Sequence, residues 1–531
     1  MRERILVWTA VCLLTALTYY QFPGHTYLQS DTQIYVPILE HFWDPGVLGK
    51  DLIVETPHVS YTIYDEAALA LRTLTGWGFE QILTLQQVVF RALGIWGWYL
   101  TAAAFGLPVG PSLLVAAILS LGATIGGPSV LSIEYEPVPR GFAVPLVFLG
   151  IGLAAQGRYL TAGAAGGAAF LYHPPTAYPF WAVYLFFARR RVRASLPLLG
   201  AAAMLFVLSM VQKGVTEPQL FFVRIDPQWE ALQRMRAAYN WISIWGPNWL
   251  AHYAVLTALT ALAVARLWKE MPPDLRIFAA GLPAIGALSV PASYLLLEEA
   301  KWALTPQAQP MRALLFLTGM AVLLAAVAAC RAARAGRWWE ALPWFALAYV
   351  IPANVRLWPL PASPRIWVVL GLSALACLAV WAEKRGQRWA LIPAALAAFF
   401  VIPSYGNVRN YPALRTPELV ELAQWARTST PKEAVFLLAD ADRDLDAGIF
   451  RALSLRTVFV DWKGGGQVNY FRSLGEDWWR RWQWAMAKPL DRPDRYAPMG
   501  IAFVVRSPKR QAADRPALFR NAKFVVYSTK R

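Results

Sequence analysis

The sequence predicts an α-helical polytopic membrane protein that ends in a small α/β domain. Its 531 residues are 57% hydrophobic and only 16% charged, whereas soluble domains carry about a quarter charged residues. The apolar residues form runs of roughly 17 to 25 residues, long enough to cross a hydrocarbon core about 30 Å thick. The net charge of +17 does not predict nucleic-acid binding, because the basic residues cluster in short loops between apolar runs, as topology determinants do.

About thirteen apolar runs are expected to cross the membrane. The first is long and has no small-residue cleavage site after it, so it is expected to be an uncleaved span rather than a signal peptide. Several others are short or contain proline, and one is broken at His173, Pro174 and Pro175. The runs lie near residues 4–22, 82–105, 111–131, 140–156, 159–172, 176–188, 195–212, 248–267, 276–297, 311–330, 340–353, 365–382 and 389–404.

Basic residues predict the orientation of these spans. Cytoplasmic loops are enriched in lysine and arginine, and one alternation of the spans collects nearly every basic cluster. It places the N-terminus in the cytoplasm and the first long loop (23–81) outside, so the protein is expected to be a multi-pass protein of the inner (cytoplasmic) membrane. The basic residues of the expected cytoplasmic loops are Arg2, Arg4, Arg158, Arg189, Arg190, Arg191, Arg193, Arg266, Lys269, Arg276, Arg331, Arg334, Arg337, Lys384, Arg385 and Arg388.

The tail (405–531) is expected to be a small extracytoplasmic α/β domain that follows a transmembrane domain over residues 1–404. An odd number of spans leaves this tail outside. Thr416 and Pro417 have the pattern of a helix start. Strand-like runs follow at residues 435–439, 456–461, 501–505 and 523–528, with a tryptophan-rich helix at about 476–487.

Two stretches of the tail resemble ligand-binding motifs without matching them. The acidic run has Leu445 where a calcium loop needs glycine and Arg451 where it needs glutamate. A strand followed by Asp-x-Asp also resembles the metal site of nucleotide-sugar glycosyltransferases, but the tail is small for that fold. The stretch "WKGGGQVNY" lacks the GxGxxG spacing of dinucleotide-binding proteins. We therefore expect the acidic run to be a solvated loop; its aspartates are Asp440, Asp442, Asp444 and Asp446.

Asp31 is the first candidate functional residue. It lies in "GHTYLQSDTQIY", within roughly ten residues of the expected bilayer edge, and Tyr35 is one of its hydrogen-bonding neighbours. A carboxylate at membrane level is costly, so it is usually functional or paired. An ordinary solvated loop acid is the alternative.

Further polar residues are expected at span ends on the same side. "SIEYEPVPRG" contains Glu134, Glu136 and Arg140, which either line the same cavity as Asp31 or form a structural salt bridge. "KWALTPQAQPMRA" adds Lys301, Gln309 and Arg312; arginine suits phosphate because its planar fork contacts two oxygens. Interfacial snorkelling is the alternative for the two cations. His173 lies at a helix break that either lines a cavity or has a structural role.

Together these features resemble the GT-C superfamily of membrane glycosyltransferases. The shared layout is many spans, an acid early in a long first outer loop, short re-entrant-like outer segments and a C-terminal extracytoplasmic domain. The tail patterns "LAQWARTSTPKEAVFLL", "RALSLRTVFVDWKGGG" and "EDWWRRW" are similar to bacterial members of uncharacterised specificity. The resemblance implies an enzyme that transfers a sugar from a polyprenyl-phosphate carrier to a glycan, lipid or protein acceptor at the outer face of the bilayer.

The resemblance also implies roles for the candidate residues. Asp31 would be the general base, with Glu134 or Glu136 as the reserve. The superfamily's adjacent acidic pair is missing, because Ser30 precedes Asp31 and Thr32 follows it. No cofactor is therefore expected to be required, and the use of a divalent metal stays open. The expected substrate-binding residues are Tyr35, Arg140, His173, Lys301, Gln309 and Arg312.

Two other classes of protein remain as alternatives. A secondary transporter would explain the spans and their breaks, but transporters usually show repeated halves, and this sequence shows none. A non-catalytic membrane assembly subunit would explain the folded tail without any chemistry.

Overall fold

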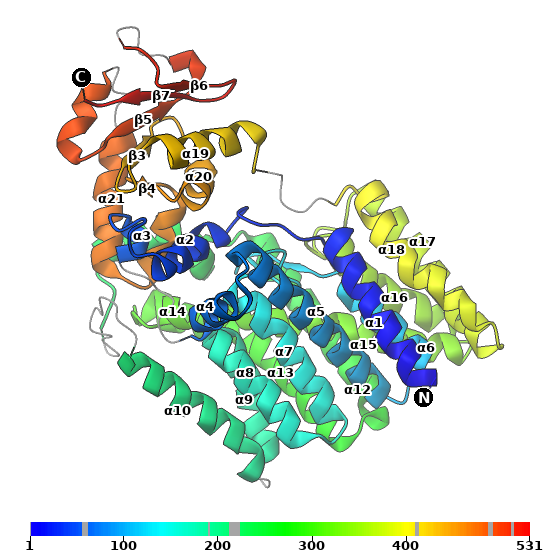
Figure 1. Cartoon of the computed structure of the whole chain (residues 1–531). Helices are drawn as coiled ribbons and strands as arrows, with labels where there is room; N and C mark the ends of the chain where they lie inside the picture. Colours follow the sequence, from blue (N-terminus) through cyan, green and yellow to red (C-terminus); the bar gives the residue numbers. More distant parts are fainter. Residues whose placement is uncertain are drawn as a thin grey trace.

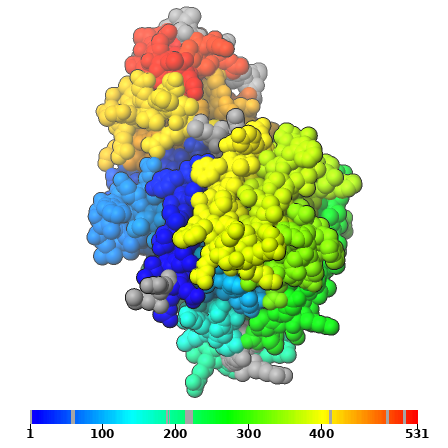
Figure 2. Space-filling view, turned by 90° about the vertical axis from the view of Figure 1, so that its right-hand side faces the viewer, coloured from blue at the N-terminus to red at the C-terminus, as the bar shows by residue number. Residues whose placement is uncertain are grey.

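The computed structural model describes residues 2–55, 62–189, 192–211, 223–408, 414–486, 492–510 and 515–530. A large bundle of helices carries a smaller part that contains a β-sheet, which lies at one end of the bundle (Figure 1). Figure 2 shows the same arrangement from the side, with the blue N-terminal segments beneath the tail. The chain is therefore an α-helical membrane protein with a small C-terminal α/β part.

Each of the thirteen expected spans falls on a helix. Six helical segments of the described chain are long and apolar enough to cross a membrane. They contain α10, α12, α13, α15, α17 and α18. The thirteen helices are α1 (Arg2–Tyr20), α5 (Phe79–Ala104), α6 (Val109–Ser120), α7 (Pro139–Ala155), α8 (Tyr159–Tyr172), α9 (Pro174–Ala188), α10 (Leu196–Val211), α12 (Pro247–Leu267), α13 (Pro273–Ser293), α15 (Leu314–Arg334), α16 (Trp338–Ala353), α17 (Ser363–Lys384) and α18 (Leu391–Tyr405).

The third expected span, near 111–131, is wrong at its C-terminal end. Helix α6 ends at Ser120, and a short hairpin of β1 (Thr124–Ile125) and β2 (Val130–Leu131) follows. Gly122 ends the helical path with a φ of +74°, a conformation that only glycine adopts without strain. With 12 residues, α6 is about 18 Å long, which is shorter than the hydrocarbon core.

Helix α15 is the centre of the bundle. Its sequence is apolar around the whole circumference, which is typical of a helix without a solvent- or lipid-facing side. All residues of its most apolar 18-residue window are buried, and α12, α13, α16 and α17 pack around it. The candidate residue Arg312 lies in η6 (Pro310–Ala313), directly before this central helix.

The loops expected on the cytoplasmic side meet one another at one end of the bundle. Arg266 Nε donates to Glu340 Oε1 at 2.6 Å, Tyr159 donates its hydroxyl to Asp274 Oδ2 at 2.6 Å, and Lys384 Nζ donates to the Arg334 carbonyl at 2.6 Å. We call this the basic end. The tail and the first long loop lie at the opposite end, the tail end (Figure 1).

The first long loop is itself helical. It contains α2 (Thr32–Trp43), α3 (Leu52–Glu55) and α4 (Tyr64–Thr75). Ile34 and Ile38 of α2 share a buried cluster with Ile53 and with Leu455 of the tail. The loop is therefore a platform on which the tail is packed; its residue His58 lies outside the described residues.

The tail contains a five-stranded sheet in the order β4-β3-β5-β7-β6. The four expected strands are confirmed as β3 (Val435–Leu438), β4 (Thr457–Val458), β5 (Phe503–Arg506) and β7 (Val525–Ser528), and β6 (Phe519–Arg520) is an additional edge strand. Strand β3 is parallel to β4 and β5. Helices α19 (Pro417–Ser429), α20 (Asp446–Ser454) and α21 (Arg472–Met486) complete the tail, and Thr416 caps α19 as expected.

Candidate functional site

A polar cavity of about 210 Å³ lies between the tail end of the bundle and the tail. Residues from the first long loop, the bundle and the tail all line it. Six of the residues singled out in the sequence do so: Asp31, Tyr35, Arg140, His173, Gln309 and Arg312. We call this space the site cavity.

Asp31 is the acid of the site cavity. It precedes α2 and does not cap that helix with its side chain; its carboxylate instead accepts hydrogen bonds from Arg140 Nη1 at 2.9 Å and lies 2.7 Å from Lys463 Nζ. Burial alone would raise the pKa of the Asp31 carboxyl, but the charges of Lys463 and Arg140 outweigh it and hold the pKa well below its usual range. Asp31 is therefore ionised at neutral pH.

Glu136 and Glu134 do not line the site cavity; they support it from behind. Glu136 accepts backbone N–H bonds from Gln29 at 2.6 Å, Ser30 at 2.7 Å and Thr32 at 3.1 Å, which fixes the chain on both sides of Asp31. Glu134 accepts from Arg140 Nε at 2.6 Å. Glu134 and Glu136 were the expected reserve bases. Their carboxylate oxygens already accept hydrogen bonds from Arg140 and from the backbone beside Asp31.

Arg312 and Arg236 line the cavity as cations without carboxylate partners in the described part of the chain. The Arg312 guanidinium lies 5.3 Å from the ring centre of Tyr239, and its buried Nε has no hydrogen-bond partner. Arg236, at the end of α11 (Pro227–Arg236), donates to two backbone carbonyls, those of Trp462 at 2.8 Å and Lys463 at 3.2 Å. Both guanidinium groups can therefore take up an anion.

Lys301 does not reach the site cavity, which corrects its expected place in phosphate binding. Its Nζ lies 2.9 Å from Glu230 Oε1 and 5.3 Å from the ring centre of Trp241. Glu230 also pairs with Arg234 at 2.7 Å. Lys301 thus belongs to a local ion-pair cluster that holds the segment before α15.

His173 lies at the start of α9, where its Nδ1 accepts from the Thr176 backbone N–H at 3.2 Å. It combines the two interpretations that the sequence left open. The ring caps a helix, and it also lines the site cavity.

The tail contributes residues that sequence analysis did not single out. Lys463, Gln467 and Tyr470 line the cavity from η8 (Lys463–Asn469) and the residue after it. They belong to the stretch "WKGGGQVNY", which lacks the GxGxxG spacing of dinucleotide-binding proteins. The sequence signal for these residues is a lysine followed by three glycines directly after a strand-like run. The glycines permit a close approach of the backbone to other groups: a Cβ at Gly464 would come within 2.9 Å of Asp461 Oδ1.

A buried ion triad connects the first long loop to this glycine-rich stretch. Arg451 Nε donates to Asp51 Oδ2 at 2.8 Å, and its Nη2 donates to Asp461 Oδ1. The three side chains are 0 to 3% exposed. Asp461 Oδ2 accepts from the backbone N–H of Gly464 at 3.2 Å. The triad therefore fixes the backbone directly after Lys463.

The described residues contain no group of three His, Cys, Asp or Glu side chains that could hold a metal ion. Both oxygens of Asp31 face cations. In the tail, Asp440 accepts from the Ser507 N–H at 2.8 Å and pairs with Arg510 at 3.1 Å. Asp31 is the one carboxylate among the described residues that line the site cavity, and it is paired with two cations.

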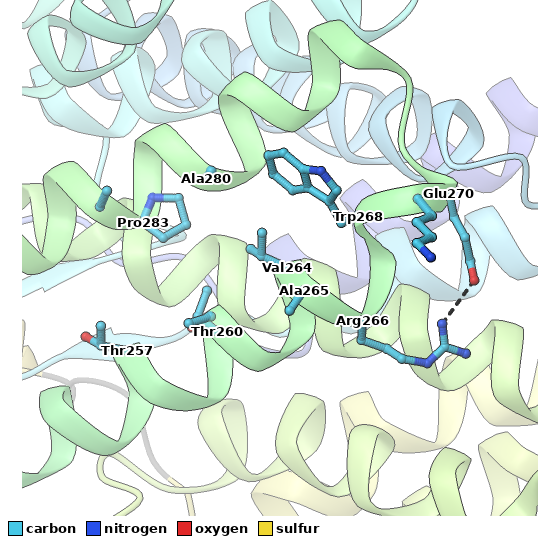
Figure 3. A pocket seen from close by; sticks show the side chains of 12 residues that line it. Thr257, Thr260, Val264, Ala265, Arg266, Trp268, Glu270, Ala280 and Pro283 are labelled. Atoms are coloured by element: carbon cyan, nitrogen blue, oxygen red, sulfur yellow. Dashed lines mark hydrogen bonds and ion pairs between the residues drawn. The ribbon is translucent and has the colours of Figure 1, made fainter.

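A larger groove of about 770 Å³ lies between α12 and α13 near the basic end (Figure 3). Its walls are mostly apolar, as Val264, Ala265 and Ala280 illustrate. Arg266 and Glu270 at its rim pair with each other at 3.0 Å. The charged lining residues of the groove are Arg266, Lys269 and Glu270.

One family and several solved structures are similar to this chain. A domain family of unknown function, DUF6798, matches residues 417–485, which lie in the tail. No curated protein matches the chain significantly in sequence.

Three solved structures illustrate the structural likeness. ArnT from Cupriavidus metallidurans bound to undecaprenyl phosphate has 15% identity and a TM-score of 0.47, over 98% of this chain and 97% of its own. The mycobacterial arabinofuranosyltransferase AftD has 15% identity and a TM-score of 0.45, over 95% of this chain and 35% of its own. The oligosaccharyltransferase AglB from Archaeoglobus fulgidus, in complex with an inhibitory peptide and a dolichol-phosphate, has 12% identity and a TM-score of 0.38, over 95% and 69%. Because the identities are 12–15% and the TM-scores are below 0.5, a function for this chain has to be argued from the residues of its own site cavity.

Replacing Arg451 with methionine is expected to destabilise the protein strongly. The change leaves Asp51 and Asp461 buried without their cation, and breaking a buried pair costs about 3–5 kcal/mol. The thermal unfolding midpoint of the purified protein measures it. Arg510→Met is the matched control, because Arg510 is 60% exposed in its pair with Asp440 and an exposed pair contributes about 0–1 kcal/mol. Equal midpoints in the two variants would contradict the supporting role of the triad.

Proposed function

We propose that the protein is a membrane glycosyltransferase that transfers a sugar from a polyprenyl-phosphate carrier to an acceptor hydroxyl of a glycan, lipid or protein. The observation that carries the proposal is the composition of the site cavity, in which one carboxylate faces four cations at the end of a membrane bundle. The carboxylate is Asp31, and the cations are Arg140, Arg236, Arg312 and Lys463.

The charge balance of the cavity favours an anionic substrate. Asp31 and Glu134 pair with Arg140 and Lys463, whereas Arg236 and Arg312 have no carboxylate partner among the described residues. Arginine forks bind phosphate oxygens in pairs, and Arg312 has a buried Nε without a partner. We infer that Arg312 and Arg236 hold the donor's phosphate.

The size of the cavity limits what it can enclose. Its volume of about 210 Å³ is below the range of about 300–1,000 Å³ that is usual for ligand pockets. It accommodates a phosphate and a single sugar ring rather than an oligosaccharide. The carrier's hydrocarbon tail would lie in the bilayer beside the bundle. In two of the similar structures a polyprenyl phosphate is bound, and the proposal for this chain rests on its own residues.

The proposed reaction is a single displacement. The acceptor's hydroxyl oxygen attacks the anomeric carbon and its proton passes to the Asp31 carboxylate. The bond between the anomeric carbon and the phosphate oxygen breaks, and its electron pair stays on the phosphate. The cations that face the cavity stabilise the charge that develops there. Tyr35, His173 and Gln309 are positioned to orient the sugar.

Asp31→Asn is expected to lower the transfer rate by about 10²–10⁴-fold, the usual contribution of a general base. The change preserves the size of the side chain and removes its basicity. Single-turnover transfer from a radiolabelled polyprenyl-phosphate sugar measures it. Asp274→Asn at the basic end is the matched control, because Asp274 accepts from Tyr159 at 2.6 Å far from the cavity.

The same assay separates the alternatives. A wild-type rate in Asp31→Asn would refute the base assignment. A transporter or an assembly subunit would show no transfer with any donor, in wild type and variants alike.

Arg312→Lys is expected to raise the KM for the donor clearly, and Arg312→Ala to raise it further. Lysine preserves the charge but loses the two-pronged contact with phosphate oxygens. Arg385→Lys is the matched control, because the Arg385 guanidinium also lies over an aromatic ring, 3.8 Å from the centre of Trp381, but at the basic end. Identical KM values in wild type and both Arg312 variants would show that this residue only anchors its helix.

We further propose that the basic end faces the cytoplasm and that the tail and the site cavity lie outside, in the inner membrane. The clustering of arginine and lysine at one end supports this orientation. Single cysteines at Lys384 and Lys509 test it with a membrane-impermeant thiol reagent in intact cells. We expect labelling at position 509 only; labelling at position 384 only would reverse the orientation.

A further inference from the structure

Lys463 has two anchors of different kinds. Its Nζ lies 2.7 Å from Asp31 Oδ1 and 3.1 Å from Ser30 Oγ. Its backbone is held separately, because Arg236 donates to its carbonyl at 3.2 Å and Asp461 holds the next N–H at 3.2 Å. The side chain can therefore move on its flexible four-carbon stem while the backbone stays in place.

The two cations on Asp31 differ in how firmly they are held. Arg140 is bound on its far side by Glu134, with Nε and Oε1 2.6 Å apart. Lys463 forms no second ion pair with a carboxylate in the described part of the chain. If one cation leaves Asp31, it is Lys463.

Asp31 cannot serve well as a base while both cations stay on it. Lys463 and Arg140 hold the pKa of its carboxyl well below the usual range, although burial would raise it. A carboxylate accepts a proton more readily when a neighbouring opposite charge is removed. An arriving phosphate group offers Lys463 another anion in the same small cavity.

We propose that Lys463 is a catalytic residue that moves from Asp31 to the phosphate of the bound donor, so that Asp31 becomes an effective base only when the donor is present. This inference rests on the proposed function. It assigns to the tail a direct part in the reaction.

The charges of the reaction agree with this movement. The donor's phosphate diester carries one negative charge, and it carries two after the bond to the anomeric carbon has broken. The acceptor's proton is by then on Asp31, which no longer needs a cation. Lys463 remains protonated throughout, and its positive charge goes where negative charge develops.

A double-mutant cycle on binding tests the proposal without turnover. The probe is undecaprenyl phosphate, which carries the phosphate but no sugar, and its Kd is measured on the full-length protein in nanodiscs. The four proteins are wild type, Lys463→Gln, Asp31→Asn and the double variant.

Asp31→Asn is expected to tighten binding of the probe, because it removes a negative charge and releases Lys463. In the Lys463→Gln background the second effect is gone, so the gain from Asp31→Asn should be about tenfold smaller, within the range of couplings in shared charge networks. Lys463→Gln alone should weaken probe binding and lower transfer by about 10²–10³-fold, as loss of a transition-state donor does.

Lys432→Gln is the matched control. Lys432 also joins the tail to an aspartate of the first long loop, Asp44 at 3.2 Å, but its side chain is 63% exposed. Binding and transfer should be unchanged in this variant. A single cooperative thermal unfolding transition in each of the five proteins shows that all of them are folded.

Two other outcomes would each overturn a different claim. If Asp31→Asn improves probe binding equally with and without Lys463, Lys463 does not move to the phosphate and the inference is wrong, while the proposed function stands. If wild type binds no probe and transfers no sugar, the proposed function itself is wrong.

Discussion

The paired charges of Asp31, Arg140 and Lys463 are the interaction on which the site depends. A carboxylate in this partly enclosed position is tolerated because two cations share it. Each member has its own support: Glu136 fixes the backbone at Asp31, Glu134 fixes Arg140, and Asp461 fixes the backbone beside Lys463. Several buried polar contacts thus hold these three charged side chains in place.

The first long loop supplies the surface on which the tail is held. Two of its aspartates act at different depths, Asp31 at the cavity and Asp51 in the buried triad with Arg451. Apolar packing of Ile34 and Ile38 against Leu455 adds to the same interface. Displacing the tail would expose the apolar cluster and separate the buried charges of the triad, so these contacts fix the position of the tail on the first long loop.

Much of the bundle and part of the site could be predicted from the sequence. A membrane-spanning helix is a continuous apolar run of sequence, so hydropathy alone predicted the thirteen helices that the bundle contains in the described residues. Clusters of basic residues predicted which loops lie at the same end. Asp31, Arg140 and Arg312 were predicted because they are charged residues at span ends on the expected outer side, where a charged group near the membrane is usually functional or paired. The hairpin after Ser120 was missed because its apolar residues, Ile125, Val130 and Leu131, were assigned to the span, although the stretch 126–129 (Gly-Gly-Pro-Ser) between them favours a turn.

The remaining parts depend on contacts that no local pattern records. Lys301 and Glu136 carry the expected charge types, but their partners, Glu230 and the backbone around Ser30, were decided by tertiary packing. Lys463 is separated from Ser30 by 433 positions, and nothing near it in sequence indicates a carboxylate partner. Its glycines were interpreted by spacing, whereas their function is close approach to Asp461 and Trp478.

This long separation has a consequence for biosynthesis. At a synthesis rate of about 5–20 residues per second, the ribosome needs roughly 20–90 s to reach Lys463 after it has made Asp31. During that time the bundle can insert while its cavity still lacks one wall and one cation. If Lys463 acts as proposed, the nascent protein is inert towards the donor until the tail has been made, moved to the tail end of the bundle and folded. A chain that stops before η8 would still contain the membrane bundle, but it would lack Lys463, which pairs with Asp31.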